Sequence, residues 1–295
     1  MTARKTWLEV SLNGSWTRRH QPLIPVAVEE IVAQGIACAR AGAAILHLHA
    51  YDAATGRQRD EAELYAAIIA GLRAQTDAII YPTIPALDGA GLDPEERARR
   101  RYAAIAALAE RGLLEWSVVD PGTVNLNSYD AIAAGRPGSV YLNPESDVRA
   151  GLALAERYRV HPSYAIYEPG FLRLGAALHR SRPGAPQPIY RLMFSEQLAF
   201  GFPPRKSALD AYLDLLALEA PDARWMVAGL GVDIMPLIPA AVEAGGHVRV
   251  GLEDAPLGTT IDNEGWTRRA AAAIEAAGGS LASPAEVRAA LATRN

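Results

Sequence analysis

Two histidines separated by a single residue, His47 and His49, are the clearest chemical feature of this sequence. They follow the apolar residues 43–46, and such a run is typical of a buried β-strand. Successive side chains of a strand point to opposite faces, so both imidazoles lie on one face and Leu48 lies on the other. Imidazole nitrogen is a common zinc ligand, so the pair could bind one metal ion. Because the same pattern also occurs as a packed pair, the metal interpretation needs a third ligand.

A candidate third ligand ends a second short strand far downstream. Residues 245–254 contain an apolar stretch and finish in two adjacent carboxylates, Glu253 and Asp254. Two histidines and one glutamate would hold a catalytic zinc ion and leave a coordination position open for a substrate oxygen. The ion would act as a Lewis acid that polarises a carbonyl group and stabilises an enolate. We therefore expect a zinc site made by His47, His49 and Glu253.

Arg249 lies four residues before Glu253, so strand alternation places the two side chains on one face. Arg249 could neutralise a substrate carboxylate or position Asp254. The alternative is an ion pair between Arg249 and Asp254 that only stabilises the fold, because structural networks also contain buried charges. His247, on the same strand, is expected to be packed or hydrogen-bonded.

The elements that must position these residues alternate between strand-like and helical segments, as in a parallel sheet with crossover helices. The expected strands are 7–12, 44–50, 78–83, 115–119, 164–167, 189–194, 225–230 and 248–252. The expected helices are 26–41, 61–74, 94–111, 145–158, 171–180, 207–218, 236–244 and 267–277. Eight strands predict the α/β class and a closed (β/α)8 TIM barrel, with residues 1–295 as one catalytic domain. Residues 120–143 are expected to form a long loop with one short surface strand at 139–142.

Chemistry in such a barrel gathers at the carboxyl ends of the strands. Polar side chains fall at or just beyond several expected strand ends: His49, Thr83, Ser117, Glu168, Glu253 and Asp254. Barrel closure makes strands that are distant in sequence face one interior, so these side chains converge. This convergence strengthens the metal hypothesis.

Composition narrows the class of function. The chain is 50% hydrophobic and its formal net charge is −4, which gives no broad basic surface for nucleic acid and favours a small-molecule substrate. Its single cysteine, Cys38, excludes an internal disulfide, and its only lysines, Lys5 and Lys206, make a Schiff-base aldolase a poor fit. Residues 1–12 lack a secretory pattern and no apolar run reaches membrane-spanning length, so a cytoplasmic protein is expected.

Three sequence blocks, residues 41–49, 225–231 and 245–254, resemble the β-keto acid cleavage enzymes, a family typified by 3-keto-5-aminohexanoate cleavage enzyme. The similarity extends over nearly the whole chain, with the blocks in the same order and at compatible spacing. The resemblance implies a zinc-dependent barrel enzyme, commonly a homotetramer, that condenses a β-keto acid with acetyl-CoA. The products would be acetoacetate and a new acyl-CoA, formed by retro-Claisen cleavage. We expect a homo-oligomer, either a tetramer or a dimer.

The resemblance also implies roles for individual residues. Asp254, assisted by Arg249, would be the catalytic base, while the His47, His49 and Glu253 set would hold Zn²⁺. Thr83 and Ser117 align with hydroxyl residues that bind the substrate carboxylate.

Ser15 aligns with an acidic residue that receives a substrate amino group in the family. An amine-bearing substrate would lose its counter-charge here. This replacement, with others nearby, points to a smaller or more apolar substituent on the β-keto acid, or to a different carbonyl substrate.

Two other functions are compatible with the pattern. A metal-dependent hydrolase of the amidohydrolase type also uses H-x-H on a barrel strand, but it carries the motif on the first strand, whereas here it is on the second. A barrel that binds a metabolite without catalysis would retain zinc and show no CoA-dependent turnover. CoA itself could contact four arginines expected near the barrel mouth: Arg18, Arg19, Arg57 and Arg205.

Overall fold

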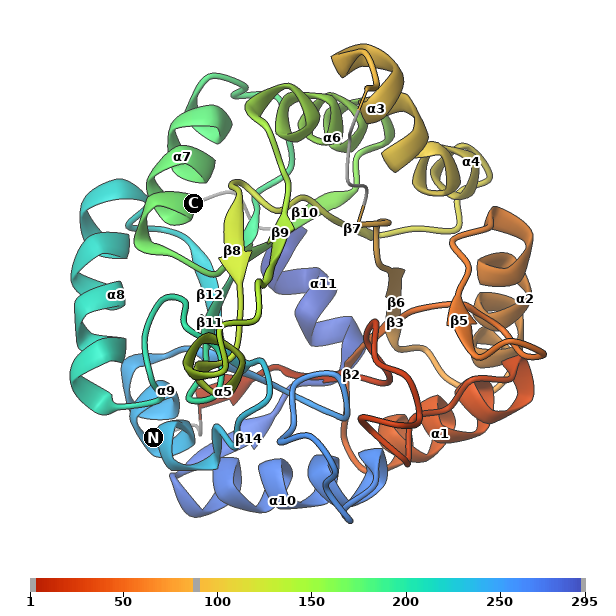
Figure 1. Cartoon of the computed structure of the whole chain (residues 1–295). Helices are drawn as coiled ribbons and strands as arrows, with labels where there is room; N and C mark the ends of the chain where they lie inside the picture. The colour runs from red at the N-terminus through yellow and green to blue at the C-terminus, as the bar shows by residue number, and fades with distance from the viewer. Residues whose placement is uncertain (1–3, 87–90, 293–295) are drawn as a thin grey trace.

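Eight parallel strands form the sheet that positions the candidate site, as the computed structural model shows for residues 4–86 and 91–292 (Figure 1). They are β2 (Leu8–Ser11), β3 (Ile45–Leu48), β6 (Ile79–Pro82), β7 (Trp116–Val118), β10 (His161–Ile166), β11 (Ile189–Phe194), β12 (Arg224–Gly229) and β13 (His247–Val250). The hydrogen-bonded order is β6-β3-β2-β13-β12-β11-β10-β7, and the end strands β6 and β7 lie in contact. The predicted (β/α)8 barrel is therefore confirmed.

Helices form the outer ring in Figure 1. They are α1 (Val28–Arg40), α2 (Ala62–Arg73), α3 (Pro94–Arg101), α4 (Ala103–Glu110), α6 (Glu145–Tyr158), α7 (Pro169–Arg180), α8 (Lys206–Glu219), α9 (Ile238–Ala244) and α10 (Asn263–Ala276). A 3-10 turn, η1 (Met235–Leu237), precedes α9. The strands are buried on both faces, as expected when helices cover a parallel sheet.

Three predicted helices need correction. The helix expected over 267–277 is α10, which begins four residues earlier because Asp262 caps it by accepting the Gly265 backbone N–H. The helix expected over 94–111 is two helices, because Tyr102 leaves the helical conformation with φ −100° and ψ 8°. Its ring is buried against Gly151 of α6, where a side chain larger than hydrogen would collide with it. The helix expected from 236 begins as the 3-10 turn η1 and becomes α-helical only at Ile238.

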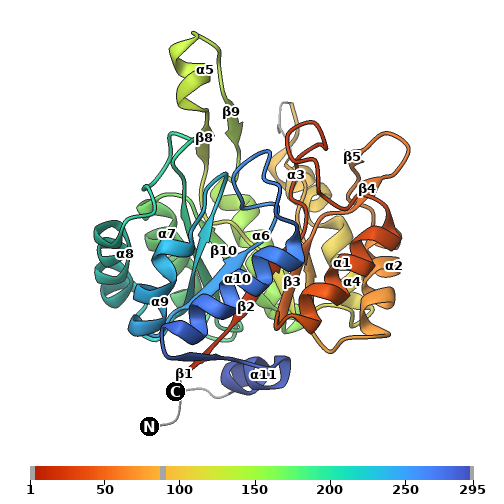
Figure 2. The same cartoon turned by 90° about the horizontal axis from the view of Figure 1, so that it is seen from below.

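The long loop predicted over residues 120–143 is largely a hairpin. Strands β8 (Val124–Leu126) and β9 (Ser139–Tyr141) pair antiparallel, with the short helix α5 (Tyr129–Ala133) between them. Ser128 begins α5 by accepting a hydrogen bond from the backbone N–H of Ala131 at 3.1 Å. Only the strand near 139–142 was expected. The hairpin projects beyond the carboxyl ends of the barrel strands (Figure 2).

The opposite end of the barrel is covered. Strand β1 (Arg4–Thr6) pairs with β14 (Gly279–Leu281), and α11 (Pro284–Ala292) lies across this end in both views (Figures 1 and 2). Inside, the His247 ring stacks on Trp7 at 4.0 Å and its Nδ1 accepts the Trp7 backbone N–H, which confirms the packed role expected for this histidine. Within the described residues, no helix is long and apolar enough to cross a membrane.

Candidate active site

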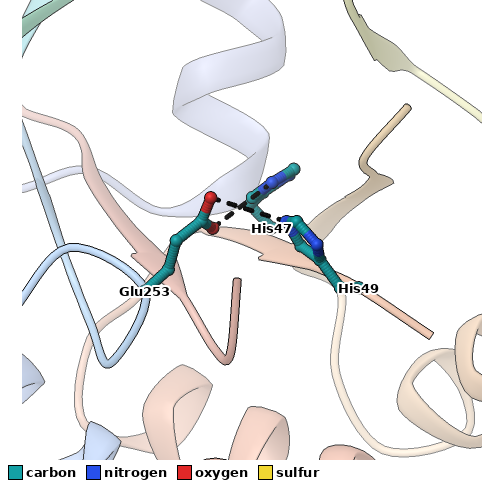
Figure 3. Close-up of side chains that lie close together, drawn as sticks. All are labelled: His47, His49 and Glu253. Carbon is teal, nitrogen blue, oxygen red and sulfur yellow. Dashed lines mark ion pairs between the residues drawn. The ribbon is translucent and has the colours of Figure 1, made fainter. Parts of the chain in front are cut away.

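His47, His49 and Glu253 meet inside the barrel at the carboxyl ends of β3 and β13 (Figure 3). His47 Nε2 lies 3.5 Å from Glu253 Oε2, and His49 Nε2 lies 3.5 Å from Glu253 Oε1. One ligand atom from each of the three residues falls within 4.8 Å of the others. The structure thus brings together the three side chains predicted from the sequence, although Glu253 lies far along the chain from the two histidines.

The backbone of His49 is fixed by an asparagine. Asn13 Oδ1 accepts the His49 backbone N–H at 2.9 Å, and Asn13 Nδ2 donates to the His49 carbonyl at 3.0 Å. Because β3 ends at Leu48, these two bonds replace the strand pairing that His49 lacks. Asn13, at the end of the first barrel strand, was not nominated from the sequence.

Glu253 is placed by two glycines. Gly251 has φ +131°, and a β-carbon there would collide with the backbone of Ser11, so only glycine allows the end of β13 to approach β2 this closely. Gly14, with φ +65°, similarly leaves room for the Glu253 side chain. Trp16 Nε1 then donates to the Glu253 carbonyl at 2.8 Å.

A chain of side-chain hydrogen bonds orients His49. Its Nδ1 lies 2.9 Å from Gln58 Oε1, while Gln58 Nε2 donates to both oxygens of Asp60 at 2.8 and 2.9 Å. Asp60 also accepts the Tyr65 hydroxyl at 2.5 Å. Since Asp60 fixes the amide with its oxygen toward the imidazole, Nδ1 is the protonated nitrogen and Nε2 presents its lone pair to the site.

Arg249 contacts three carboxylates at once. It binds Asp254 through Nε and Nη2, both at 2.9 Å, and it lies 3.1 Å from Glu9 and 3.1 Å from Glu253. Ser11 Oγ donates to Glu253 Oε2 at 2.9 Å and to Asp254 Oδ1 at 3.2 Å. One guanidinium against three carboxylates leaves an excess of negative charge beside the histidines, which a divalent cation would offset.

The pKa shifts at the site follow from burial and from these charges. Burial lowers the pKa of His47 well below its usual 6.5, so its imidazole is neutral. Burial also acts to lower the pKa of His49, but the nearby Glu253 carboxylate and the hydrogen bond to Gln58 outweigh it and raise that pKa. Burial acts to raise the pKa of Glu253, and the Arg249 charge reverses this and holds it well below 4.5. Burial raises the pKa of Asp254 above 3.8.

These residues fit a metal ion. His49 Nε2 and His47 Nδ1 are buried and have no hydrogen-bond partner among the residues described. A buried imidazole nitrogen without a partner is costly, and coordination would satisfy His49 Nε2 where it faces the carboxylate. Two imidazole nitrogens and one carboxylate are a common ligand set of catalytic zinc.

A cavity of about 720 Å³ opens beside this cluster at the barrel mouth. Its walls include His47, His49 and Glu253, together with two of the predicted substrate-binding residues, Ser15 and Thr83. The hairpin contributes residues from β8 and β9, so the segment expected to be a loop forms one side of the cavity. Ser15 is exposed and Thr83 is buried.

Other nominated residues lie away from this cavity. Ser117 is fully buried and does not line the cavity, whereas the next residue of β7, Val118, does. The Ser117 hydroxyl donates to the Val118 carbonyl at 3.4 Å. Asp254 and Arg249 are brought together as predicted, but they lie behind Glu253 and outside the lining. The four arginines considered for CoA are not among the lining residues either.

Sequence analysis missed several polar residues of the cavity, among them Gln58, Asp120 and Arg191. Gln58 comes from the small hairpin of β4 (Tyr51–Asp52) and β5 (Arg57–Gln58), Asp120 follows β7, and Arg191 lies within β11. Asp120 had a usable signal, since it falls just beyond a strand end. Arg191 had a weaker one, a lone charge inside the otherwise apolar strand 189–194.

Fold and site together define a (β/α)8 barrel enzyme with a candidate metal centre in the cavity at the carboxyl ends of its strands. The chain belongs to the beta-keto acid cleavage enzyme family, whose model matches residues 5–292.

Several characterised relatives are named for reactions of this kind. The chain is 27% identical to 3-oxoadipate:acetyl-CoA acetyltransferase of Cupriavidus necator, covering 84% of this chain and 79% of the relative. It is also 27% identical to 3-keto-5-aminohexanoate cleavage enzyme of Fusobacterium nucleatum, over 81% of this chain and 78% of that relative. Identity to 3-dehydrocarnitine:acetyl-CoA trimethylamine transferase of Rhizobium meliloti is 26%, covering 90% and 88%. The chain belongs to a family of enzymes, so a barrel without catalysis is set aside.

Solved structures agree on the fold. ObcA in complex with oxaloacetate superposes with a TM-score of 0.68 at 16% identity, covering 92% of this chain and 67% of that protein. The homocysteine methyltransferase MmuM of Escherichia coli superposes with a TM-score of 0.54 at 13% identity, covering 94% and 96%.

Proposed function

We propose that the protein transfers the acyl group of a β-keto acid to CoA in a zinc-dependent reaction with acetyl-CoA. The observation that carries this proposal is the meeting of His47, His49 and Glu253 at the wall of a cavity large enough for a small acid. Two further findings support the same reaction: the chain belongs to the family, and the names of two relatives include acetyl-CoA as a substrate.

The proposed reaction is balanced without a further reactant. The bond between the keto carbon and the adjacent CH₂ of the β-keto acid breaks, and the keto carbon with its substituent becomes the acyl group of a new acyl-CoA. The thioester bond of acetyl-CoA also breaks: its acetyl group bonds to the CH₂–carboxylate fragment, which becomes acetoacetate, and its CoA sulfur bonds to the keto carbon. No oxidant or reductant is needed.

Zinc, when bound, would supply Lewis-acid polarisation of the keto oxygen of the substrate. His47, His49 and Glu253 would hold it, while Gln58 fixes the His49 ring. Thr83 lines the cavity and is proposed to bind a substrate oxygen through its hydroxyl.

Asp254 is the proposed base, held in place by Arg249. Burial raises its pKa, which makes the carboxylate a stronger base than an exposed aspartate. It does not line the cavity, and its contact with Ser11, which also bonds Glu253, links it to the wall. Ser15 offers no charge to a substrate amine, so an amine-free β-keto acid is proposed.

The direct test is a panel of β-keto acids incubated with purified protein and acetyl-CoA, with the acyl-CoA products followed by mass spectrometry. We expect one or more acids to give acetoacetate and the matching acyl-CoA in equal amounts. Thorough chelation should abolish the reaction and added zinc should restore it. Full activity after chelation would exclude the metal role, while hydrolysis of amides without CoA would favour the amidohydrolase alternative. A cytoplasmic homo-oligomer, tetramer or dimer, stays a prediction, and light scattering would give the number of subunits.

A further inference from the structure

Arg191 and the histidine pair line the same cavity from opposite sides. Arg191 lies on β11, which is four strands from β3 in the order of the sheet, and β3 carries His47. In a barrel of eight strands this separation is half a circuit. A small substrate bound at the histidines therefore extends toward Arg191.

The guanidinium of Arg191 is poorly satisfied. Only Nη2 has hydrogen-bond acceptors among the described residues: Asp120 Oδ1 at 3.4 Å and the Ser163 carbonyl at 3.3 Å. The side chain is only 4% exposed, and its buried Nε has no hydrogen-bond partner among the described residues. Arg249, also buried on a barrel strand, instead has Nε, Nη1 and Nη2 all within 3.1 Å of carboxylates.

Asp120 does not complete the bonding of Arg191. Its Oδ1 already accepts the backbone N–H of Ala165 at 2.8 Å, and its Oδ2 accepts the Tyr141 hydroxyl at 2.7 Å. Both bonds are shorter than the contact with Arg191. Asp120 is therefore anchored mainly to β10 and to the β9 side of the cavity, and it leaves most of the guanidinium without an acceptor.

A carboxylate is the chemical group that this arrangement lacks. The planar fork of a guanidinium accepts a carboxylate through two parallel hydrogen bonds, and such charge-assisted bonds are strong away from bulk water. The surrounding wall is largely apolar, with Ile84, Val118 and Leu230 among its residues, so water competes weakly. A substrate with a cationic substituent would be repelled at the same place.

We propose that Arg191 binds a carboxylate of the substrate inside the cavity and thereby selects the acid, an inference that rests on the proposed function for the nature of the substrate. The carboxylate can come from two sources. It is either the carboxylate next to the CH₂ of the β-keto acid or a second carboxylate at the far end of a 3-oxo diacid. Either carboxylate would bind the guanidinium in the same way, and binding measurements with two different acids distinguish the two possibilities.

The test measures binding without turnover. Zinc-loaded protein is titrated calorimetrically with acetoacetate and with 3-oxoadipate, in the absence of acetyl-CoA. Arg191→Gln is expected to weaken binding by about 10- to 100-fold, and Arg191→Lys to recover part of the loss, because it keeps the charge without the fork. Arg173→Gln is the matched control, since it removes the same charge from the exposed surface of α7 and should bind both acids as the wild type does.

The two ligands distinguish the source of the carboxylate. An equal loss for both acids assigns Arg191 to the carboxylate they share, and a loss confined to 3-oxoadipate assigns it to the second carboxylate. The proposal is overturned if folded Arg191→Gln binds both acids with an affinity within twofold of the wild-type affinity. It is also overturned if the wild-type protein binds neither acid. If Arg191→Gln does not fold, a crystal structure of the zinc-loaded wild type with 3-oxoadipate decides, because a carboxylate must lie within hydrogen-bond distance of Arg191.

This experiment is independent of the proposed reaction. Arginine-dependent binding with no acyl exchange would leave the inference standing and refute the reaction. Acyl exchange with unchanged binding in Arg191→Gln would do the opposite.

Discussion

Gln58 Oε1 lies 2.9 Å from His49 Nδ1, so a residue of a surface hairpin fixes which nitrogen of the candidate metal ligand faces the cavity. Partners of this kind make the imidazole a better ligand, and losing them typically weakens metal binding by about 10- to 100-fold. Gln58→Leu should show a weakening of that size for zinc in competition with a chromophoric chelator. The exposed Gln75→Leu should bind zinc as the wild type does. Unchanged affinity in Gln58→Leu would show that the hydrogen bond does not orient the ring.

Removal of a proposed ligand should empty the site. Glu253→Gln and His49→Ala each leave two ligands, so zinc measured by mass spectrometry of the purified protein should fall from about one ion per chain to a small fraction of that. The rate of acyl exchange should fall together with the zinc content, and a higher substrate concentration should not restore activity in either variant. Glu63→Gln, at an exposed residue of α2, is the control for loss of a carboxylate. Full zinc occupancy in both site variants would refute the ligand set.

Asp254→Asn tests the proposed base separately from the metal. The amide cannot take up a proton, so kcat should fall by about 10²- to 10⁴-fold, the usual contribution of general base catalysis. Zinc content should stay near that of the wild type, because Asp254 is not a proposed ligand. Turnover equal to wild type would remove Asp254 from the mechanism, and loss of zinc together with activity would assign it a positioning role instead.

Zinc affinity should rise with pH. The pKa of His49 in the metal-free protein is raised, mainly because Glu253 and Gln58 outweigh the effect of burial, so a proton competes with zinc for Nε2. Below that pKa the imidazole is protonated, so the apparent affinity for zinc falls as the pH decreases. Above it the imidazole is neutral, and the affinity for zinc no longer changes with pH. Chelator competition from pH 5.5 to pH 8.5 measures this curve. A flat profile across the range would contradict a titrating His49.

A buried ion pair between α3 and α6 should matter for stability. Arg97 binds Asp147 at 2.9 to 3.1 Å, and Asp147 is 1% exposed. Asp147→Ala leaves a buried guanidinium without its partner, a change that usually costs about 3–5 kcal/mol, so the Tm should fall by roughly 5–15 °C in circular dichroism. Glu145→Gln, which breaks an exposed pair with Arg149, should shift it by about 3 °C or less. Equal shifts in both variants would contradict the importance of burial.

Local sequence patterns were sufficient for the elements that carry the site. The apolar runs around His47 and before Glu253 predicted strands, and alternation with helical segments predicted the barrel that brings β3 and β13 to one interior. The break at Tyr102 and the hairpin at 124–141 could not be predicted in this way. Each depends on long-range packing, of the Tyr102 ring on Gly151 and of β8 on β9.

The sequence alone was enough to identify the candidate metal-binding histidines, because period-two alternation places His47 and His49 on one face whatever surrounds them. Tertiary structure decided which charges reach the cavity. Arg249 and Asp254, close in sequence to Glu253, do not line the cavity, whereas Arg191 on β11 and Asp120 just after β7 do. The reason is geometric, since closure of the barrel sets which inward-facing side chains share a level, and that level depends on the register of all eight strands.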